Sequence, residues 1–258
     1  MATYLDRILD AHRRAAAEDR RPLTQLVDAA RAQPPTRGFR SALATASGIA
    51  VIAEIKRRSP SKGDLNPNLD PADVAMTYEE GGASCLSVLT DREFFGGSPG
   101  DLKEARAVSR LPVLRKDFTV AGHDICDARL MGADAVLLIA AALSPKELTG
   151  FHELATEVGL DALVEVHDDA ELEVALAAGA TLVGVNQRDL VTFEVDRARA
   201  ERMAGVIPAG IVKVAESGVR DADDARRLAD AGYDAILVGE TLVTSPDPAR
   251  AIHDLKGD

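Results

Sequence analysis

The chain has 258 residues, 46% of them hydrophobic and 28% charged, and a formal net charge of −12. Its acidity argues against a nucleic-acid-binding surface, and its two cysteines, which form no CxxC pair, predict neither a disulfide framework nor a zinc site. No apolar run approaches the roughly 20 residues of a membrane span, and the first residues lack a secretory pattern, so we expect a cytoplasmic protein that binds neither membrane nor nucleic acid.

Residues 1–47 are predicted to form a helical extension before the first strand. Apolar residues recur there with i, i+3, i+4 spacing, which is typical of helices that bury one face. These residues are Leu5, Ile8 and Leu9, then Leu23, Leu26, Val27 and Ala30. Pro22 separates the two groups and Pro34-Pro35 ends the second, so we expect two helices that pack across the rest of the fold.

Eight apolar strands are predicted in the remainder of the chain. Four follow the glycines at 82, 132, 179 and 232, each of which ends a helical stretch, and these glycines lie roughly 50 residues apart. The other four are expected at 51–56, 113–116, 162–165 and 211–216. The alternation of strands and helices predicts one α/β domain over 1–258, a (β/α)8 TIM barrel with parallel strands. An open doubly wound sheet is the alternative, but no GxGxxG follows the first strand and the spacing is even.

Polar residues end several of these apolar strands. In the first strand, side-chain alternation places Ile52, Glu54 and Lys56 inside the barrel. The third, fifth, sixth and seventh strands end in Lys116, Glu165, Asn186 and Glu216. Barrel enzymes carry their active sites at this end of the strands, so convergence of these groups predicts a catalytic site. Mutual neutralisation in structural ion pairs is the alternative interpretation, because burying unpaired charge is costly.

A phosphate site is predicted after the seventh and eighth strands. Ser217 and Gly218 follow the seventh strand, and Gly239 and Glu240 follow the eighth. Glycines there allow backbone N–H groups to approach a phosphate at the start of a helix. The loop 57–64 adds three cations within six positions, at 57, 58 and 62, and is expected to be a mobile lid that helps to capture an anion.

The combination of motifs resembles that of indole-3-glycerol phosphate synthase. The motifs are IAEIKRRSPS at 52–61, LRKDF at 114–118, LVEVH at 163–167, GVNQRDL at 184–190 and AESG at 215–218. Gln187 departs from the family pattern, which more often has Asn or Ser there. The resemblance implies that the substrate is 1-(2-carboxyphenylamino)-1-deoxyribulose 5-phosphate. It also implies closure of the indole ring with release of carbon dioxide and water, and it implies no cofactor and no metal.

Roles for the site residues follow from this chemistry. Lys116 is expected to protonate the ketone, provided that cationic neighbours or partial burial tune its pKa, and Glu165 to accept a proton in the dehydration. Glu54 would hold Lys116 or shuttle protons, and Lys56 would bind the substrate carboxylate or phosphate. The residues expected to orient sugar hydroxyls and catalytic groups are Asn186, Arg188 and Glu216. Those expected to contact the rest of the substrate are Ser59, Phe118, Leu137 and Leu190, although core packing explains the three apolar ones equally well.

Three other functions remain open at this point. A Schiff-base aldolase would use Lys116 or Lys213 as its nucleophile. A sugar-phosphate isomerase would need an acid and a base but no large aromatic pocket. A non-catalytic phosphate-binding barrel would leave the charged strand ends unexplained. We expect a monomer or a weak homo-oligomer.

Overall fold

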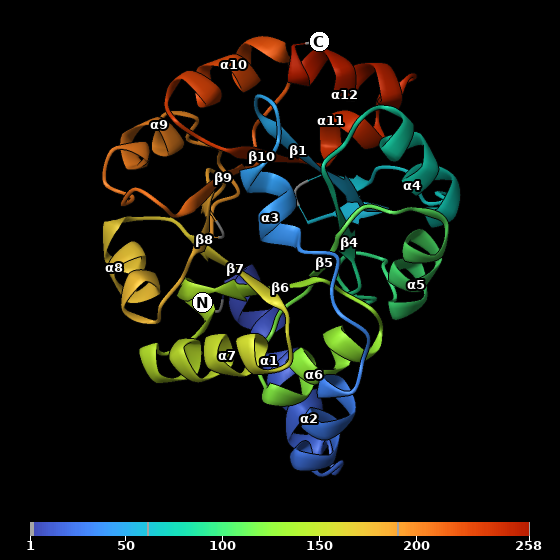
Figure 1. Ribbon diagram of the computed structural model, residues 1–258, viewed down its shortest axis with the longest axis vertical. Helices are drawn as coiled ribbons and strands as arrows, with labels where there is room; N and C mark the ends of the chain where they lie inside the picture. The colour runs from blue at the N-terminus through green and yellow to red at the C-terminus, as the bar shows by residue number, and fades with distance from the viewer. Residues whose placement is uncertain (1–2, 61, 190, 258) are drawn as a thin grey trace.

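Eight parallel strands close into a barrel, as Figure 1 shows in a view along the barrel axis. The computed structural model describes residues 3–60, 62–189 and 191–257. The barrel strands are β1 (Ala50–Ile55), β4 (Cys85–Leu89), β5 (Val113–Lys116), β6 (Ala135–Ile139), β7 (Asp161–Val166), β8 (Leu182–Asn186), β9 (Val212–Glu216) and β10 (Ala235–Val238). The closed order β1-β10-β9-β8-β7-β6-β5-β4 confirms the predicted barrel and is incompatible with an open sheet.

Helices surround the barrel and follow its strands in sequence. They are α4 (Pro71–Glu80), α5 (Pro99–Val108), α6 (Gly122–Leu130), α7 (Pro145–Glu157), α8 (Asp169–Ala177), α9 (Ala198–Ala204), α10 (Ala222–Asp230), α11 (Glu240–Val243) and α12 (Pro248–Lys256), with a 3-10 turn η1 (Ala140–Ala142). Most begin where an Asp or Ser side chain accepts a backbone N–H of the first turn, as Asp70 does for α4 and Ser144 for α7. None of the helices in the described part of the chain is long and apolar enough to cross a membrane.

The side chains of the strands divide between two apolar clusters, as alternation predicts. Val51, Ala53 and Ile55 pack between the barrel and its helices. Ile52 packs inside the barrel with residues such as Leu114. This arrangement confirms that Glu54 points inward, one step nearer the carboxyl end of β1 than Ile52.

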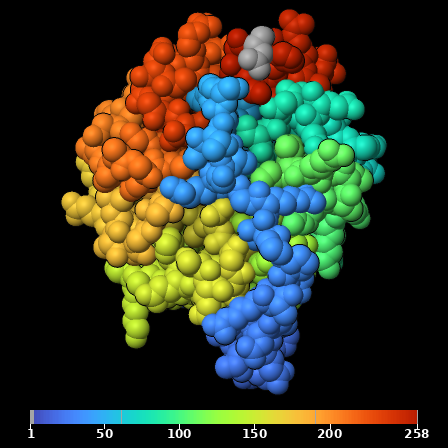
Figure 2. Space-filling view, in the orientation of Figure 1, coloured from blue at the N-terminus to red at the C-terminus, as the bar shows by residue number. Residues whose placement is uncertain are grey.

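Three helices precede the barrel, where the sequence pattern predicts two. They are α1 (Tyr4–Glu18), α2 (Leu23–Arg31) and α3 (Phe39–Ala44). The unexpected α3 lies across the N-terminal end of the barrel, in the foreground of Figures 1 and 2, while α2 projects beside α6. Phe39 and Leu43 of α3 are buried against the inner barrel residues. Six residues with two apolar anchors make less than two helical turns, which is too short for a periodic signal.

The burial of Phe39 predicts a large contribution to stability. Phe39→Ala removes a fully buried ring from the N-terminal end of the barrel, so we expect the free energy of unfolding to fall by about 3–5 kcal/mol. Denaturant unfolding measures the change, with Val206→Ala as a control because the Val206 side chain is 51% exposed. A loss below about 1 kcal/mol would show that α3 does not seal the barrel.

Candidate active site

A cavity of about 440 Å³ opens at the carboxyl ends of the barrel strands. Fourteen of the fifteen residues expected at the site line it, and the other, Leu190, lies outside the described residues. The fourteen are Glu54, Lys56, Ser59, Lys116, Phe118, Leu137, Glu165, Asn186, Arg188, Glu216, Ser217, Gly218, Gly239 and Glu240. Residues from all parts of the barrel sequence therefore meet in one place.

Four charged residues form the uppermost layer of the barrel interior. Glu54, Lys116, Glu165 and Glu216 come from β1, β5, β7 and β9, which are alternate strands of the barrel. Alternate strands supply the four side chains of each interior layer in this fold, and these are usually aliphatic. Here Lys116 Nζ lies 3.3 Å from Glu165 Oε2 and 3.8 Å from Glu216 Oε2. The layer thus surrounds one ammonium group with carboxyl groups.

The pKa of Lys116 is set by these carboxyl groups. Burial by itself would lower it, but the charges of Glu165, Glu216 and Glu54 outweigh burial and raise the pKa above its ordinary value. Of the two influences that the sequence interpretation allowed, cationic neighbours or partial burial, burial acts on Lys116, and carboxyl groups rather than cations are its charged neighbours. The residue is therefore a stable ammonium that has a proton to donate.

The two carboxyl groups nearest Lys116 differ in proton affinity. Burial favours the neutral form of Glu165, but Lys116, His167 and a hydrogen bond from Asn186 hold its pKa below the usual value. Burial and the negative charge of Glu165 raise the pKa of Glu216 well above the usual value. Glu165 is thus the member of the pair that loses its proton more readily, and Glu216 is the member that binds a proton more tightly.

Glu54, which the sequence interpretation expects to hold Lys116 or to shuttle protons, is hydrogen-bonded to Lys56. Lys56 Nζ lies 2.5 Å from Glu54 Oε1, and Glu54 reaches Lys116 only through its charge. The cavity holds these side chains because Gly239 has no Cβ, which would overlap Glu54 Oε1. Gly184 on β8 makes similar room for Glu216 Oε1.

The backbone after β9 has the sharp turn expected of a phosphate cradle. Ser217 and Gly218 both have positive φ, +66° and +79°, a region that L side chains rarely adopt. A Cβ at Gly218 would lie 2.6 Å from Val195 Cγ1, so only glycine fits. Gln187 Nε2 donates to the carbonyl oxygen of Ser217 at 2.7 Å, which gives this departure from the family pattern a structural contact.

The loop 57–64 differs from the expected anion trap. It contains a short hairpin of β2 (Arg58–Ser59) and β3 (Gly63–Asp64). Arg57 pairs with Asp101 of α5 and Arg58 donates to the carbonyl oxygen of Glu93, and neither arginine lines the cavity. Only Lys62 of the three cations lines it, and its Nζ lies 3.6 Å from Glu240 Oε1. The two arginines therefore anchor the loop to the protein.

Aromatic side chains line the cavity near Lys116. Phe118 was expected there, and its ring lies 6.2 Å from that of Phe95. Phe95 and Phe193 also line the cavity but were missed. Both sit in loops without periodicity, and Phe193, with a φ of +61°, offers no pattern that could have revealed it.

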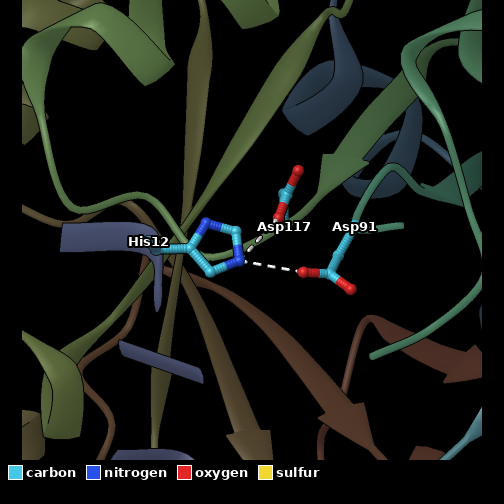
Figure 3. Close-up of side chains that lie close together, drawn as sticks. All are labelled: His12, Asp91 and Asp117. Atoms are coloured by element: carbon cyan, nitrogen blue, oxygen red, sulfur yellow. Dashed lines mark hydrogen bonds and ion pairs between the residues drawn. The ribbon is translucent and has the colours of Figure 1, made fainter. Parts of the chain in front are cut away.

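Helix α1 brings His12 to the segments that follow β4 and β5, where it faces Asp91 and Asp117 (Figure 3). His12 Nε2 lies 2.9 Å from Asp91 Oδ2 and 3.8 Å from Asp117 Oδ1. Its ring centroid lies 5.6 Å from that of Phe118. Asp91, Asp117 and Phe118 all line the cavity, so His12 joins the N-terminal extension to the site. A polar residue on an amphipathic helix carries no signal for such a contact.

The group of His12, Asp91 and Asp117 has the composition of a metal site. Their carboxylate oxygens, however, already accept hydrogen bonds. Asp117 Oδ2 accepts from Arg115 Nη2 at 2.9 Å, and Asp91 Oδ1 accepts from the backbone N–H of Phe94 at 2.6 Å. A buried arginine beside the group also repels a cation. The geometry therefore fits an ion pair that fixes α1 to the rim.

Comparison with known proteins identifies the relatives of this chain. Residues 5–255 match the sequence model of the indole-3-glycerol phosphate synthase family. Indole-3-glycerol phosphate synthase 2 of Streptomyces coelicolor is 51% identical over 245 residues, covering 95% of this chain and 93% of the relative. The indole-3-glycerol phosphate synthase of Chlorobium luteolum is 48% identical and covers 95% of each chain.

Solved structures with little sequence similarity share the fold alone. The tryptophan synthase alpha-subunit of Pyrococcus furiosus has a TM-score of 0.62 at 15% identity, covering 81% of this chain and 98% of that chain. Thiamine phosphate pyrophosphorylase of the same organism has a TM-score of 0.61 at 18% identity, covering 81% of this chain and 94% of that chain.

The His12 ion pair predicts pH-dependent stability. Burial lowers the pKa of His12, but the hydrogen bond to Asp91 and the charge of Asp117 leave it above its ordinary value. A raised pKa stabilises the fold fully below about pH 6.5, and this contribution is lost as pH rises through the raised value. We expect His12→Gln to cost about 1–3 kcal/mol at pH 5.5 and much less at pH 8.5, as measured by urea unfolding. A cost that is the same at both pH values, after comparison with exposed His253→Gln, would contradict the ion pair.

Proposed function

Because this chain belongs to the indole-3-glycerol phosphate synthase family, we propose that the charged layer at the top of its barrel performs the ring closure that this enzyme catalyses. The enzyme converts 1-(2-carboxyphenylamino)-1-deoxyribulose 5-phosphate to indole-3-glycerol phosphate, a step of tryptophan biosynthesis, with loss of carbon dioxide and water. The observation that carries the assignment of roles is one ammonium group, that of Lys116, held between two carboxyl groups at the base of a cavity.

Lys116 is the proposed general acid of ring closure. As the aromatic carbon attacks the ketone, negative charge develops on the ketone oxygen, and a proton must reach it. The raised pKa keeps a proton on Lys116 until that charge appears. Loss of carbon dioxide from the same aromatic carbon then restores the ring.

Glu165 is the proposed base of the dehydration. Loss of the new hydroxyl group and of a neighbouring carbon-bound proton completes the indole, so an ionised carboxylate is needed close to Lys116. Its lowered pKa supports this role, and Glu216, with its raised pKa, is assigned to orient Lys116 and the sugar hydroxyls. Asn186 supports Glu165 through a hydrogen bond of 3.1 Å from its Nδ2 to Glu165 Oε1.

The other lining residues are assigned by position. Lys56, fixed by Glu54, is one of the cations that line the cavity and is assigned to the substrate carboxylate or phosphate. Phe118 and Leu137 would enclose the anthranilate ring, and Leu190 is retained with them from the sequence motif. Ser59 and Arg188 would contact the polar parts of the substrate.

The phosphate is assigned to the turns after β9 and β10. Ser217 and Gly218 supply one side of the cradle, and Gly239 and Glu240 supply the other. The absence of a Cβ at Gly218 and Gly239 supports the assignment, because backbone N–H groups can approach an anion there.

The contacts of the lysines argue against a Schiff-base aldolase. Such a nucleophile must be a neutral amine, yet the pKa of Lys116 is raised. Lys213 donates to the carbonyl oxygen of Ala204 at 2.8 Å and does not line the cavity. Borohydride trapping with substrate would detect a covalent adduct on either lysine and so test the aldolase directly.

We propose in addition that the protein acts in the cytoplasm as a monomer or weak homo-oligomer. Both cysteines are buried free thiols, which suits a reducing compartment.

The role of Lys116 predicts a large loss of turnover in one variant. Lys116→Met keeps the length of the side chain but removes its proton, so kcat should fall by about a hundredfold or more. Fluorescence of the indole product measures turnover, and Lys103→Met on the exposed face of α5 is the matched control. A folded Lys116→Met variant within a few-fold of the parent would exclude Lys116 as the acid.

The role of Glu165 predicts an intermediate. Glu165→Gln keeps the shape and the hydrogen bond from Asn186 but cannot accept a proton, so the ring should close and then dehydrate slowly. Rapid-quench analysis should detect a species that has lost carbon dioxide but not water, with product affinity nearly unchanged. A variant that stalls before carbon–carbon bond formation would instead place Glu165 in the first step, and normal turnover would make it structural.

A further inference from the structure

His167 belongs to the same motif as Glu165 but has no role in the steps above. The two residues are separated by Val166 at the end of β7, so alternation places both on the same side of the strand. The His167 side chain is only 12% exposed, and His167 is not one of the residues that line the cavity. A largely buried imidazole beside the proposed base therefore requires an explanation.

Both ring nitrogens of His167 face carboxylates. Nδ1 lies 3.0 Å from Glu171 Oε2, in the first turn of α8. Nε2 lies 3.7 Å from Glu165 Oε1 and, within the described residues, has no hydrogen-bond partner. A neutral imidazole would direct a lone pair at one of the carboxylates, whereas an imidazolium presents an N–H to each. The surroundings therefore favour the charged ring.

Glu171 holds the ring in this orientation. The same oxygen, Oε2, also accepts the backbone N–H of His167 at 2.7 Å, so side chain and backbone are fixed together. Arg199 of α9 is the opposing cation near the ring, and its own Nη1 donates to the carbonyl oxygen of Asn186 at 2.9 Å. Burial and Arg199 lower the pKa of His167, and the two carboxylates together raise it above its ordinary value.

The two oxygens of Glu165 consequently have different neighbours. Oε1 faces Asn186 and His167, and Oε2 faces Lys116. A proton acceptor must present one oxygen to the substrate while the other is held in place. We propose that His167, oriented by Glu171, is a positioning residue that holds Glu165 by its Oε1 edge as an ionised base. This inference rests on the proposed role of Glu165 in the dehydration.

Two variants of this Glu171–His167–Glu165 relay test the inference through the pH dependence of kcat. His167→Gln removes the cation, so Glu165 should take up a proton at higher pH. The acidic limb of the pH profile of kcat should therefore move to higher pH. On that limb kcat should fall by roughly tenfold, which is less than the fall caused by removing the base itself. At high pH the His167 imidazole of the parent is also neutral, so the kcat of the parent and that of His167→Gln should converge.

Glu171→Gln should give a different profile. The amide still accepts a hydrogen bond, but the loss of charge lets the ring lose its proton at lower pH. Activity should match the parent in acid, fall below it between the lowered His167 pKa of the variant and that of the parent, and rejoin the parent at high pH, where both rings are neutral. His253→Gln on the exposed face of α12 should leave the profile unchanged.

The outcomes separate failure of the inference from failure of the proposed function. If the parent makes indole product but both relay variants lose activity equally at every pH, His167 has only a structural role and the inference is wrong. If Glu165→Gln itself has normal turnover, the assigned base is wrong. Imidazole nitrogen NMR of the parent and of Glu165→Gln is a second readout. The His167 pKa should fall when the Glu165 charge is removed, and an unchanged value would also overturn the inference.

Discussion

A buried layer of charge at the top of the barrel is the constraint on which the rest of the site depends. Three carboxyl groups and the Lys116 ammonium lie where this fold usually places aliphatic side chains, and they interact with one another at short range. Charges removed from water are tolerated only when they are balanced and hydrogen-bonded. Lys56 pairs with Glu54 and Lys116 with Glu165, and burial beside the charge of Glu165 raises the pKa of the remaining carboxyl group, Glu216. The balance of charge in this layer thus gives the two carboxyl groups beside Lys116 different proton affinities.

The N-terminal extension contacts both ends of the barrel. Helix α3 seals the end away from the site with Phe39 and Leu43, while α1 brings His12 to the rim that bears Asp91 and Asp117. The interior below the charged layer is therefore closed from one side, and α1 is fixed to the rim at the other. A segment that contributes no strand to the barrel still shapes the site.

Much of the barrel and of the site was predictable because both rest on local periodicity. Glycine followed by an apolar run located the strands, and alternation within 51–56 correctly placed Glu54 inside. Interactions between distant segments were not predictable. The anchoring of Arg57 by Asp101 and the contact of His12 with Asp91 both depend on side-chain directions that no spacing encodes. Helix α3 was not predicted because its two buried apolar residues, Phe39 and Leu43, are too few to show a helical periodicity.

The fit of Gly184 against Glu216 also constrains how this sequence can change. Any larger residue at 184 would overlap Glu216 Oε1 from the neighbouring strand, although Gly184 itself performs no chemistry. A chain that gained a methyl group at 184 while keeping Glu216 would pass through an overpacked intermediate. Position 184 can therefore grow only if the end of the Glu216 side chain moves away or position 216 shortens. Positions 184 and 216 are therefore coupled, and directed evolution of this barrel would have to vary them together.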